Sequence, residues 1–236
     1  MTNEAVAVGR VLVVDDDMTV RDVVRRYLEL AGHEVRLAGD GEAALRMFAE
    51  QPPDLVVLDL MLPGIDGLEV CRRLRQRSAV PVVMLTALGE EEDRIAGLQL
   101  GADDYVTKPF SPRELALRVT SVLRRSRATL APPPARTLVD GGLTVDLGAR
   151  GARLDGADLS LTTREFDLLT FLMSNPGQAF DRAQLLERVW GWEFGDQSTV
   201  TVHVRRLREK IEKDSARPTR ITTVWGVGYR YDGGAR

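Results

Sequence analysis

Residues 54–64 read Asp-Leu-Val-Val-Leu-Asp-Leu-Met-Leu-Pro-Gly. Four consecutive apolar residues, 55–58, thus end at an aspartate, and a Pro-Gly pair follows shortly afterwards. Similar short apolar runs occur at residues 11–14, 35–37, 80–85 and 105–106, with helix-like spacing of apolar residues between them. Runs that are apolar throughout predict strands buried on both faces, and their alternation with helices predicts a parallel sheet covered on both sides. Residues 10–125 are therefore expected to form one doubly wound α/β domain with five strands.

Polar side chains follow these strands at their carboxyl ends. Asp15 and Asp16 follow the first strand, Asp59 the third, Thr86 the fourth and Lys108 the fifth. Ligands of open parallel sheets bind at this edge, so we expect these side chains to converge. Three neighbouring carboxylates repel one another unless protons or a cation neutralise them, and oxygen ligands favour Mg²⁺.

Such a site is suited to forming an aspartyl-phosphate, because a carboxylate can attack a phosphoryl group whose charge a metal screens. Asp59 is the expected nucleophile, since it stands alone at the end of a central strand. Asp15 and Asp16 are better placed to hold the metal and its water, while Lys108 and the Thr86 hydroxyl can donate to phosphoryl oxygens. Each residue alone is ordinary turn chemistry; the prediction depends on their joint occurrence.

The second half of the chain has a different pattern. Residues 126–136 contain three consecutive prolines and are expected to form a linker. Residues 137–161 show short alternating segments broken by glycines, which predict a small antiparallel sheet. Helices are then expected after a cap at Thr162 or Thr163 with Glu165, over 182–190 and over 198–213, followed by a hairpin over 221–231. This order predicts a winged helix-turn-helix domain over residues 137–232.

Charge is distributed unevenly between the halves. Residues 1–125 hold 16 basic and 21 acidic side chains, whereas residues 198–230 hold 8 basic and 3 acidic ones. In the predicted helix 198–213, apolar residues recur at helical spacing and are expected to face the core. The exposed arc is then expected to carry Thr201, His203, Arg205, Arg206 and Arg208. This arc could be a solvated charged face, but its place between a short helix and a hairpin favours DNA binding.

Residues 11–17, 54–64, 85–87 and 101–110 resemble the receiver domain of bacterial two-component response regulators. The resemblance covers residues 10–125 and implies that Asp59 is the phosphoacceptor. It further implies Mg²⁺ or Mn²⁺ held by Asp16, Asp59 and the Met61 carbonyl, with Asp15 acting through metal-bound water. Thr86 and Lys108 would sense the phosphoryl group, and Tyr105 would be the aromatic residue that turns inward on activation. The phosphate would come from a partner histidine kinase or a small acyl-phosphate.

Residues 161–169, 200–211 and 221–230 resemble the winged-helix effector domain of the OmpR/PhoB subfamily. The resemblance implies binding to double-stranded DNA at direct-repeat half-sites, and a loop over 190–194 that in relatives can meet RNA polymerase. The implied DNA contacts are Ser198, Thr201, His203, Arg205, Arg206, Arg208, Thr223, Trp225 and Tyr229. Relatives often carry arginine at positions 198 and 225, so we expect less reading of the minor groove here, because tryptophan lacks the charge that a narrow groove attracts.

The same subfamily implies a homodimer that forms on phosphorylation. The implied interface residues are Arg94, Ile95, Leu98, Asp103, Asp104, Glu114, Ala116, Arg118 and Arg125. Arg94 with Glu114, and Asp104 with Arg118, would pair across the two-fold axis. Because exposed ion pairs contribute only about 0–1 kcal/mol each, the apolar patch of Ile95, Leu98 and Ala116 would supply most of the association energy.

Other features exclude several classes of protein. The single cysteine, Cys71, forms no intrachain disulfide and is expected to be a small buried residue. No apolar run reaches the roughly 20 residues needed to cross a membrane, and Met1–Gly9 does not resemble a secretory signal, so we expect a cytoplasmic protein. Asp17 is expected to cap a helix or lie on the surface, and His33 to lie in a solvated loop.

Two alternatives to a phosphorylation-activated regulator remain. An aspartyl-phosphate hydrolase would also use an aspartate nucleophile, but that class usually places a second aspartate two residues later, where this chain has Met61. A DNA-binding regulator that needs no phosphate would leave the acidic site without a role, which the complete set of polar residues argues against. We therefore expect a regulator rather than an enzyme.

Overall fold

The computed structural model describes residues 8–87, 101–127, 137–191 and 197–233. The chain forms two compact units, Met1–Ala128 and Thr129–Arg236, which are described separately below. Within the described ranges, no helix has both the length and the apolar character needed to span a bilayer.

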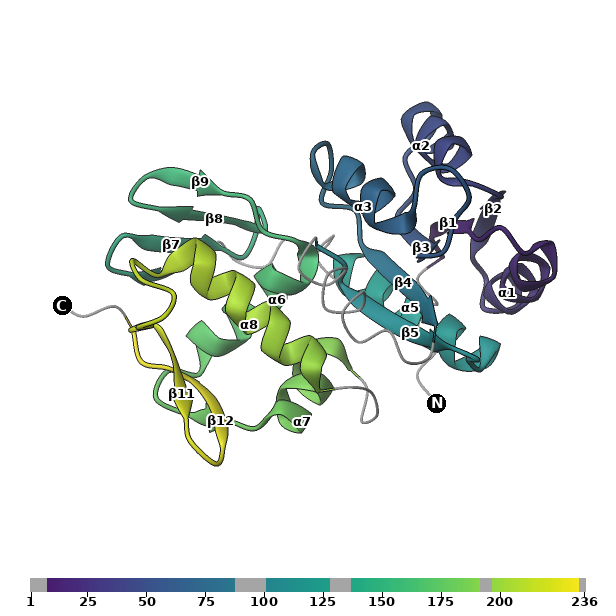
Figure 1. Cartoon of the computed structure of the whole chain (residues 1–236). Helices are drawn as coiled ribbons and strands as arrows, with labels where there is room; N and C mark the ends of the chain where they lie inside the picture. Colours follow the sequence, from purple (N-terminus) through teal and green to yellow (C-terminus); the bar gives the residue numbers. More distant parts are fainter. Residues whose placement is uncertain (1–7, 88–100, 128–136, 192–196, 234–236) are drawn as a thin grey trace. The chain divides into compact units, whose positions relative to one another are not determined.

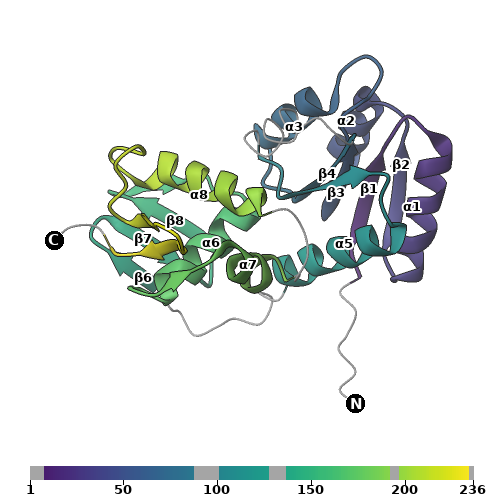
Figure 2. The same cartoon turned by 60° about the horizontal axis from the view of Figure 1, so that its bottom comes forward.

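The first unit is an α/β domain with a five-stranded parallel sheet in the order β2-β1-β3-β4-β5. Its elements are β1 (Arg10–Val14), α1 (Met18–Leu30), β2 (Glu34–Ala38), α2 (Gly41–Glu50), β3 (Leu55–Asp59), α3 (Gly67–Arg75), β4 (Val82–Ala87), β5 (Asp104–Lys108) and α5 (Pro112–Arg127). Helix α1 packs beside α5, and α2 beside α3, so that helices cover both faces of the sheet (Figure 2). The predicted doubly wound fold is confirmed.

The core of this unit explains why its strands are continuously apolar. All four residues from Leu55 to Leu58 are fully buried, as expected for a central strand that is covered on both faces. Three helices begin at aspartates, because the side chains of Asp17, Asp40 and Asp66 accept backbone N–H groups of the first turn. The capping role expected of Asp17 and the burial expected of Cys71 are confirmed.

His33 differs from its expectation. Its side chain is 4% exposed rather than solvated, because it joins three parts of the unit. Nδ1 accepts the Gly9 backbone N–H at 3.2 Å, and Nε2 lies 2.9 Å from the Thr120 hydroxyl on α5. The Thr120 hydroxyl donates to the Ala116 carbonyl, so Nε2 is the nitrogen that donates to Thr120.

The second unit combines two small antiparallel sheets with a helical layer (Figure 1). Its elements are β6 (Thr137–Asp140), β7 (Leu143–Asp146), β8 (Gly151–Leu154), β9 (Ala157–Leu159), α6 (Thr163–Ser174), β10 (Ala179–Phe180), α7 (Arg182–Leu185), a π-helical turn (Leu186–Trp190), α8 (Ser198–Ile211), β11 (Ile221–Val224) and β12 (Gly228–Tyr231). The sheet orders are β6-β7-β8-β9 and β10-β12-β11. This winged-helix architecture confirms the predicted fold.

Helix boundaries in this unit follow from specific side chains. Thr162 and Glu165 form a capping box at the start of α6, as the sequence pattern predicts. Helix α8 ends at Ile211, two residues before the predicted end, because Glu212 adopts an extended conformation. The Glu212 carboxylate accepts the backbone N–H groups of Arg220 and Ile221, each at 2.9 Å, and so anchors the strand that follows.

Candidate functional site

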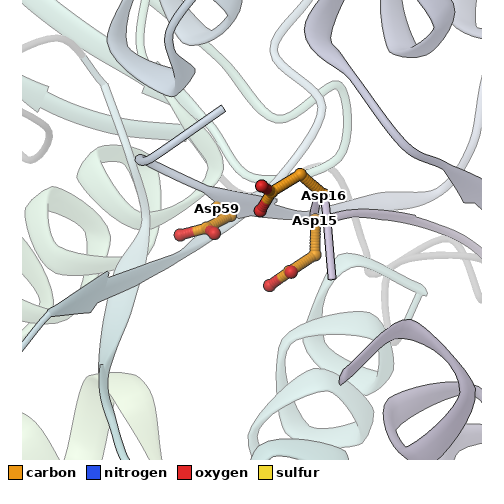
Figure 3. Close-up of side chains that lie close together, drawn as sticks. All are labelled: Asp15, Asp16 and Asp59. Atoms are coloured by element: carbon orange, nitrogen blue, oxygen red, sulfur yellow. The ribbon is translucent and has the colours of Figure 1, made fainter. Parts of the chain in front are cut away.

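The predicted acidic cluster forms at the carboxyl edge of the parallel sheet. Carboxylate oxygens of Asp15, Asp16 and Asp59 lie within 4.8 Å of one another. Figure 3 shows the three side chains approaching each other from the ends of two strands. Asp15 is buried and Asp16 is exposed, so the cluster extends from the core to the surface.

Asp59 is positioned by its strand and by the helix that follows. It is the last residue of β3, in register with Leu85 on β4, and its Oδ1 accepts the Met61 backbone N–H at 3.4 Å. Gly67, the first residue of α3, lies against this strand end, and a Cβ at that position would come within 2.2 Å of the Asp59 carbonyl oxygen. Only glycine therefore permits this approach of α3 to the strand end.

Lys108 bridges two of the three carboxylates. Its ammonium lies 2.7 Å from Asp59 Oδ2 and 2.8 Å from Asp15 Oδ2. Burial lowers the pKa of Lys108, but hydrogen bonds to both carboxylates outweigh it, so the pKa is raised. Burial raises the pKa of Asp15, and the hydrogen bond from Lys108 only partly offsets this. The Asp59 side chain is 3% exposed and that of Lys108 is 30% exposed.

Thr86 and Tyr105 lie on the neighbouring strands β4 and β5. Thr86 is 1% exposed, and its hydroxyl has no hydrogen-bond partner among the residues that the structure describes. Its register partner, Thr107, precedes Lys108 on β5. Tyr105 is 6% exposed, so its side chain is already buried in this structure. Met61 is 61% exposed and lies two residues beyond Asp59.

The donor set fits a hard divalent cation. The cluster offers carboxylate oxygens only, one of its members is open to solvent, and hard ions such as Mg²⁺ prefer oxygen ligands and retain several waters. The cluster is also the only group of this kind among the described residues.

Several residues expected at a dimer interface make contacts within one chain. Arg118 donates to Asp104 at 2.9 Å and to Glu114 at 2.8 Å. Asp103 is fully buried and pairs with Arg75 at 2.9 Å.

Several interface expectations therefore differ from the structure. Asp104 and Arg118, expected to pair across a two-fold axis, are 2% and 6% exposed and pair with each other within one chain. Asp103 is not an interface side chain, because its carboxylate accepts from Arg75 and from the Val82 backbone N–H inside the fold. Ala116 is 7% exposed and has little area to offer a partner. Arg94, Ile95, Leu98 and the side chain of Arg125 lie outside the described residues.

The expected DNA-binding residues of the second unit divide into two groups. Thr201, Arg205, Thr223 and Trp225 are exposed, and Ser198 and Arg208 are partly exposed. His203, Arg206 and Tyr229 are 0%, 8% and 4% exposed. The expectation that His203 and Arg206 lie on an exposed arc of α8 is wrong, and Tyr229, an implied DNA contact, is buried as well.

The burial of Arg206 has a physical cause on α6, where a carboxylate pairs with its guanidinium. Glu165 is fully buried, and its carboxylate accepts from Arg206 at 2.7 Å and from Lys210 at 2.6 Å. Burial raises the pKa of Glu165, but the charges of Arg206 and Lys210 outweigh it, so the pKa is lowered. His203 lies on the same side of α8, where its Nδ1 is 2.8 Å from the Thr199 carbonyl and its ring meets the Trp190 ring edge-on. Part of the polar pattern of α8 is therefore an internal network of charged side chains rather than an exposed face.

The structure adds Arg182 to the exposed face of α8. Its guanidinium donates to the Thr201 hydroxyl at 3.2 Å and lies over the Tyr229 ring. Arg208 also lies over this ring and donates to Thr223 at 2.9 Å and to the Ile221 carbonyl at 2.8 Å. The sequence signal was weak, because Arg182 is simply the residue after the Asp181 cap of a short helix.

Comparison with known proteins matches each of the two units to a protein family. A family model described as "Response regulator receiver domain" matches residues 11–120, and one described as "Transcriptional regulatory protein, C terminal" matches residues 156–231. The transcriptional regulatory protein ResD of Bacillus subtilis is 45% identical over 99% of this chain and 98% of its own length. The sensory transduction protein RegX3 of Mycolicibacterium smegmatis is 45% identical over 94% of this chain and 99% of its own length.

A solved structure gives the same result. The response regulator DrrB, described as a Thermotoga maritima OmpR/PhoB homolog, is 35% identical, with a TM-score of 0.51 over 96% of this chain and 100% of its own. The chain therefore belongs to the OmpR/PhoB family of two-component response regulators, which combine a receiver domain with a DNA-binding domain.

Proposed function

We propose that this response regulator is switched on by phosphorylation of Asp59 and then binds specific DNA sequences as a homodimer. The observation that carries the proposal is the convergence of Asp15, Asp16, Asp59 and Lys108 at one sheet edge, with the unpartnered Thr86 hydroxyl on the adjoining strand. These groups supply a nucleophile, metal ligands and two donors for phosphoryl oxygens.

Asp16, Asp59 and the Met61 carbonyl would hold Mg²⁺ or Mn²⁺, with Asp15 acting through bound water. Such an ion supplies positive charge that offsets the repulsion between the carboxylates and an incoming phosphate. Lys108 leaves its position between Asp15 and Asp59 and donates to the phosphoryl group.

Phosphorylation replaces the carboxylate charge of Asp59 with a phosphoryl group that carries about −1.5 to −2 charges. The Thr86 hydroxyl, which has no partner among the described residues in this state, gains one in the phosphoryl oxygens. Movement of Thr86 and the switch residue Tyr105 repacks the adjoining surface and so promotes dimerisation. Glu114 on α5 remains a candidate for that interface, since its side chain is 35% exposed.

The partners follow from this assignment. The phosphate donor would be a sensor histidine kinase or a small acyl-phosphate in the cytoplasm. The DNA target would consist of direct-repeat half-sites, which a dimer binds with increased effective concentration because residues 126–136 link the domain at 10–125 to that at 137–232. The loop over 190–194 would contact RNA polymerase; residues 192–196 lie outside the described part of the chain.

Phosphate incorporation from acetyl phosphate tests the receiver. Asp59→Asn should abolish stable incorporation, whereas Asp17→Asn should retain it. Asp17 is a matched control because it lies beside the site but caps α1, and asparagine caps helices equally well. Incorporation into Asp59→Asn would refute the assignment, and sustained release of phosphate from small esters would favour a hydrolase instead.

Titration with an operator selected from random DNA tests the effector. Arg205→Ala should weaken binding and reduce the dependence of log Kd on log salt by about 0.9, the value for one lost phosphate contact. Arg153→Ala is a matched control, since Arg153 and Arg205 have side chains 66% and 65% exposed and each pairs with one acidic residue. Equal affinities of the wild type and Arg205→Ala would place the DNA on another face.

A further inference from the structure

A second group of charged residues lies on the first unit, in a cavity between α2 and α3. The two helices pack beside each other on one face of the sheet (Figure 1). The cavity has a volume of about 550 Å³ and is lined by the second half of α2 and by the end of α3 with the residues that follow it. Small-molecule sites typically have volumes of about 300–1,000 Å³. The cavity is therefore large enough for a small ligand.

This cavity is separate from the acidic cluster. In a parallel α/β sheet the helices run opposite to the strands that they connect, so their C-terminal ends lie at the edge where the strands begin. Arg75, the last residue of α3, agrees with this direction, because its guanidinium donates to the Val80 carbonyl shortly before β4 begins. Asp59 instead lies at the edge where the strands end. A ligand in this cavity would thus bind apart from the proposed phosphorylation site.

One part of the cavity wall is apolar. Leu74 on α3 is 3% exposed, and Leu45 and Phe48 on α2 are partly buried. An apolar ring that contacts these side chains is removed from water, which favours binding. The Phe48 ring can in addition stack on a flat ligand.

The other part of the wall is positively charged. Arg46, Arg72, Arg73 and Arg77 all line the cavity. Glu69 accepts from Arg72 at 2.7 Å and from Arg73 at 2.6 Å. Arg46 and Arg77 are exposed and have no ion-pair partner among the described residues. One carboxylate thus balances four guanidinium groups only in part, and the excess of positive charge favours an anionic ligand.

The helix dipole explains only some of these arginines. Arg72 and Arg73 lie in the last turn of α3, where cations stabilise the negative end of the helix. Arg46 lies in the middle of α2, whose last turn contains no basic residue. Glu42 and Glu50, one turn away on the same helix, form no ion pair with Arg46 within the described part of the chain. The Arg46 guanidinium is therefore available to a ligand.

Gln76 favours a particular kind of anion. Its side chain is exposed and lines the cavity next to Arg77. A glutamine amide offers a donor and an acceptor side by side, which matches N6 and N7 of adenine, whereas the same edge of guanine offers two acceptors. Together with the apolar wall and the arginines, this amide suits an adenine base that carries phosphates.

We propose that the cavity between α2 and α3 binds an adenosine di- or triphosphate. The phosphates lie against Arg46 and Arg77, since guanidinium groups match phosphate oxygens in charge and geometry. The adenine ring packs on Phe48 and pairs with Gln76. The inference depends neither on phosphorylation of Asp59 nor on DNA binding.

Calorimetric titration of the full-length protein with ADP tests the site. EDTA is included so that no metal ion bridges the nucleotide to the acidic cluster. Arg46→Gln and Arg77→Gln should each weaken binding by about tenfold, the effect expected for loss of one hydrogen bond to a charged group. Arg26→Gln is a matched control, because Arg26 on α1 is also exposed and has no ion-pair partner among the described residues. Failure of the wild type to bind ADP, or losses no larger than that of Arg26→Gln, would overturn the proposal.

Smaller ligands separate the two parts of the cavity. ADP should bind at least about tenfold more tightly than pyrophosphate, because the base adds a stacking contact. Phe48→Leu keeps an apolar side chain but loses the ring, so it should weaken ADP binding by about tenfold and leave pyrophosphate binding unchanged. Unchanged pyrophosphate binding also shows that this variant is folded. Pyrophosphate binding as tight as that of ADP would indicate a purely electrostatic site and would refute the nucleotide assignment.

A second base and a photoreactive nucleotide test the base contact and the location. The wild type should prefer ADP to GDP, and Gln76→Ala should lose this preference. 8-azido-ADP should label residues 45–49 or 72–77 of the full-length protein. Equal affinities of the wild type for ADP and GDP would contradict the adenine assignment. Labelling confined to residues 198–230 would place the nucleotide on the second unit and would rule out the proposed site.

Discussion

The ammonium of Lys108 lies 2.7 Å from the carboxylate of Asp59, inside the acidic cluster at the sheet edge. The same ammonium lies 2.8 Å from Asp15. One lysine thus pairs with two buried carboxylates in this structure. Activation must therefore break an existing ion pair at Asp59.

Lys108→Met is expected to destabilise the protein when no divalent ion is present. Loss of the ammonium leaves Asp15 and Asp59 buried without their cation, which should lower the free energy of unfolding by on the order of 1–3 kcal/mol. Mg²⁺ should restore most of this loss, and should bind Lys108→Met more tightly than the wild type because no ammonium competes. Urea unfolding with EDTA and with Mg²⁺ measures both effects. A variant as stable as the wild type in EDTA would contradict this role of Lys108.

Thr86→Val is expected to separate stability from signalling. Because the buried Thr86 hydroxyl has no partner among the described residues, replacing it with an isosteric methyl should raise the free energy of unfolding by about 1 kcal/mol. The same change removes the donor that meets the phosphoryl group, so phosphorylation should no longer promote dimerisation. Urea unfolding measures the change in stability, and analytical ultracentrifugation with acetyl phosphate measures dimerisation. Loss of stability in Thr86→Val would show that the hydroxyl is hydrogen-bonded in the resting protein.

Substitutions of Arg118 and Glu114 should differ in cost, although both residues were expected at the dimer interface. Arg118→Ala leaves Asp104, which is 2% exposed, without this guanidinium, and should lower the free energy of unfolding by about 3 kcal/mol. Glu114→Ala removes a 35% exposed partner and should cost at most about 1 kcal/mol. Glu114 is therefore the better probe of dimerisation. Equal costs in urea unfolding would show that the Arg118–Asp104 pair contributes nothing.

Acid should destabilise the second unit. Burial, with the nearby charge of Arg206, lowers the pKa of His203 from 6.5 to about 4. Between these values the unfolded chain binds a proton that the folded chain does not, so stability falls as the pH falls from 6.5 to about 4, by on the order of 2–3 kcal/mol. Below pH 4.5, protonation of Glu165, whose folded pKa is lowered, removes further stability.

Urea unfolding at pH 7, 5.5 and 4.5 measures this dependence, with Trp190 as a fluorescent probe beside His203. His203→Asn should flatten the dependence between pH 6.5 and 4.5, because asparagine does not titrate. Identical pH profiles of the two proteins would assign the acid sensitivity to other groups.

Much of the fold could be predicted from local pattern. Local sequence predicts the five strands, the capping box of Thr162 and Glu165, and the turn at Gly226. The reason is that apolar patterning, capping and turn chemistry depend on residues one to four positions apart. The acidic cluster could also be predicted from the sequence, since topology brings the carboxyl ends of parallel strands to one edge. Position and residue type were enough to identify these features.

Pairs of residues that lie far apart in sequence could not be predicted in this way. Helical spacing alone predicted that Arg206 and His203 lie on the exposed face of α8. In the structure this face packs against α6, because Arg206 pairs with the buried carboxylate of Glu165, about 40 residues earlier. Asp103 was likewise expected at an interface, but its buried carboxylate pairs with Arg75, 28 residues earlier in the chain. A charged side chain is buried only when its counter-charge is present.

The amino-acid sequence by itself thus determined the two domains' folds and the set of groups around Asp59, because alternating apolar runs and strand-end residues are local properties of the chain. Tertiary structure decided which charges face water: it placed Lys108 across Asp15 and Asp59, buried Arg206 against Glu165, and left Trp225 in solvent. The reason is that the energy of an ionised group depends on the charges and solvent around it, and only the folded chain brings those distant partners together.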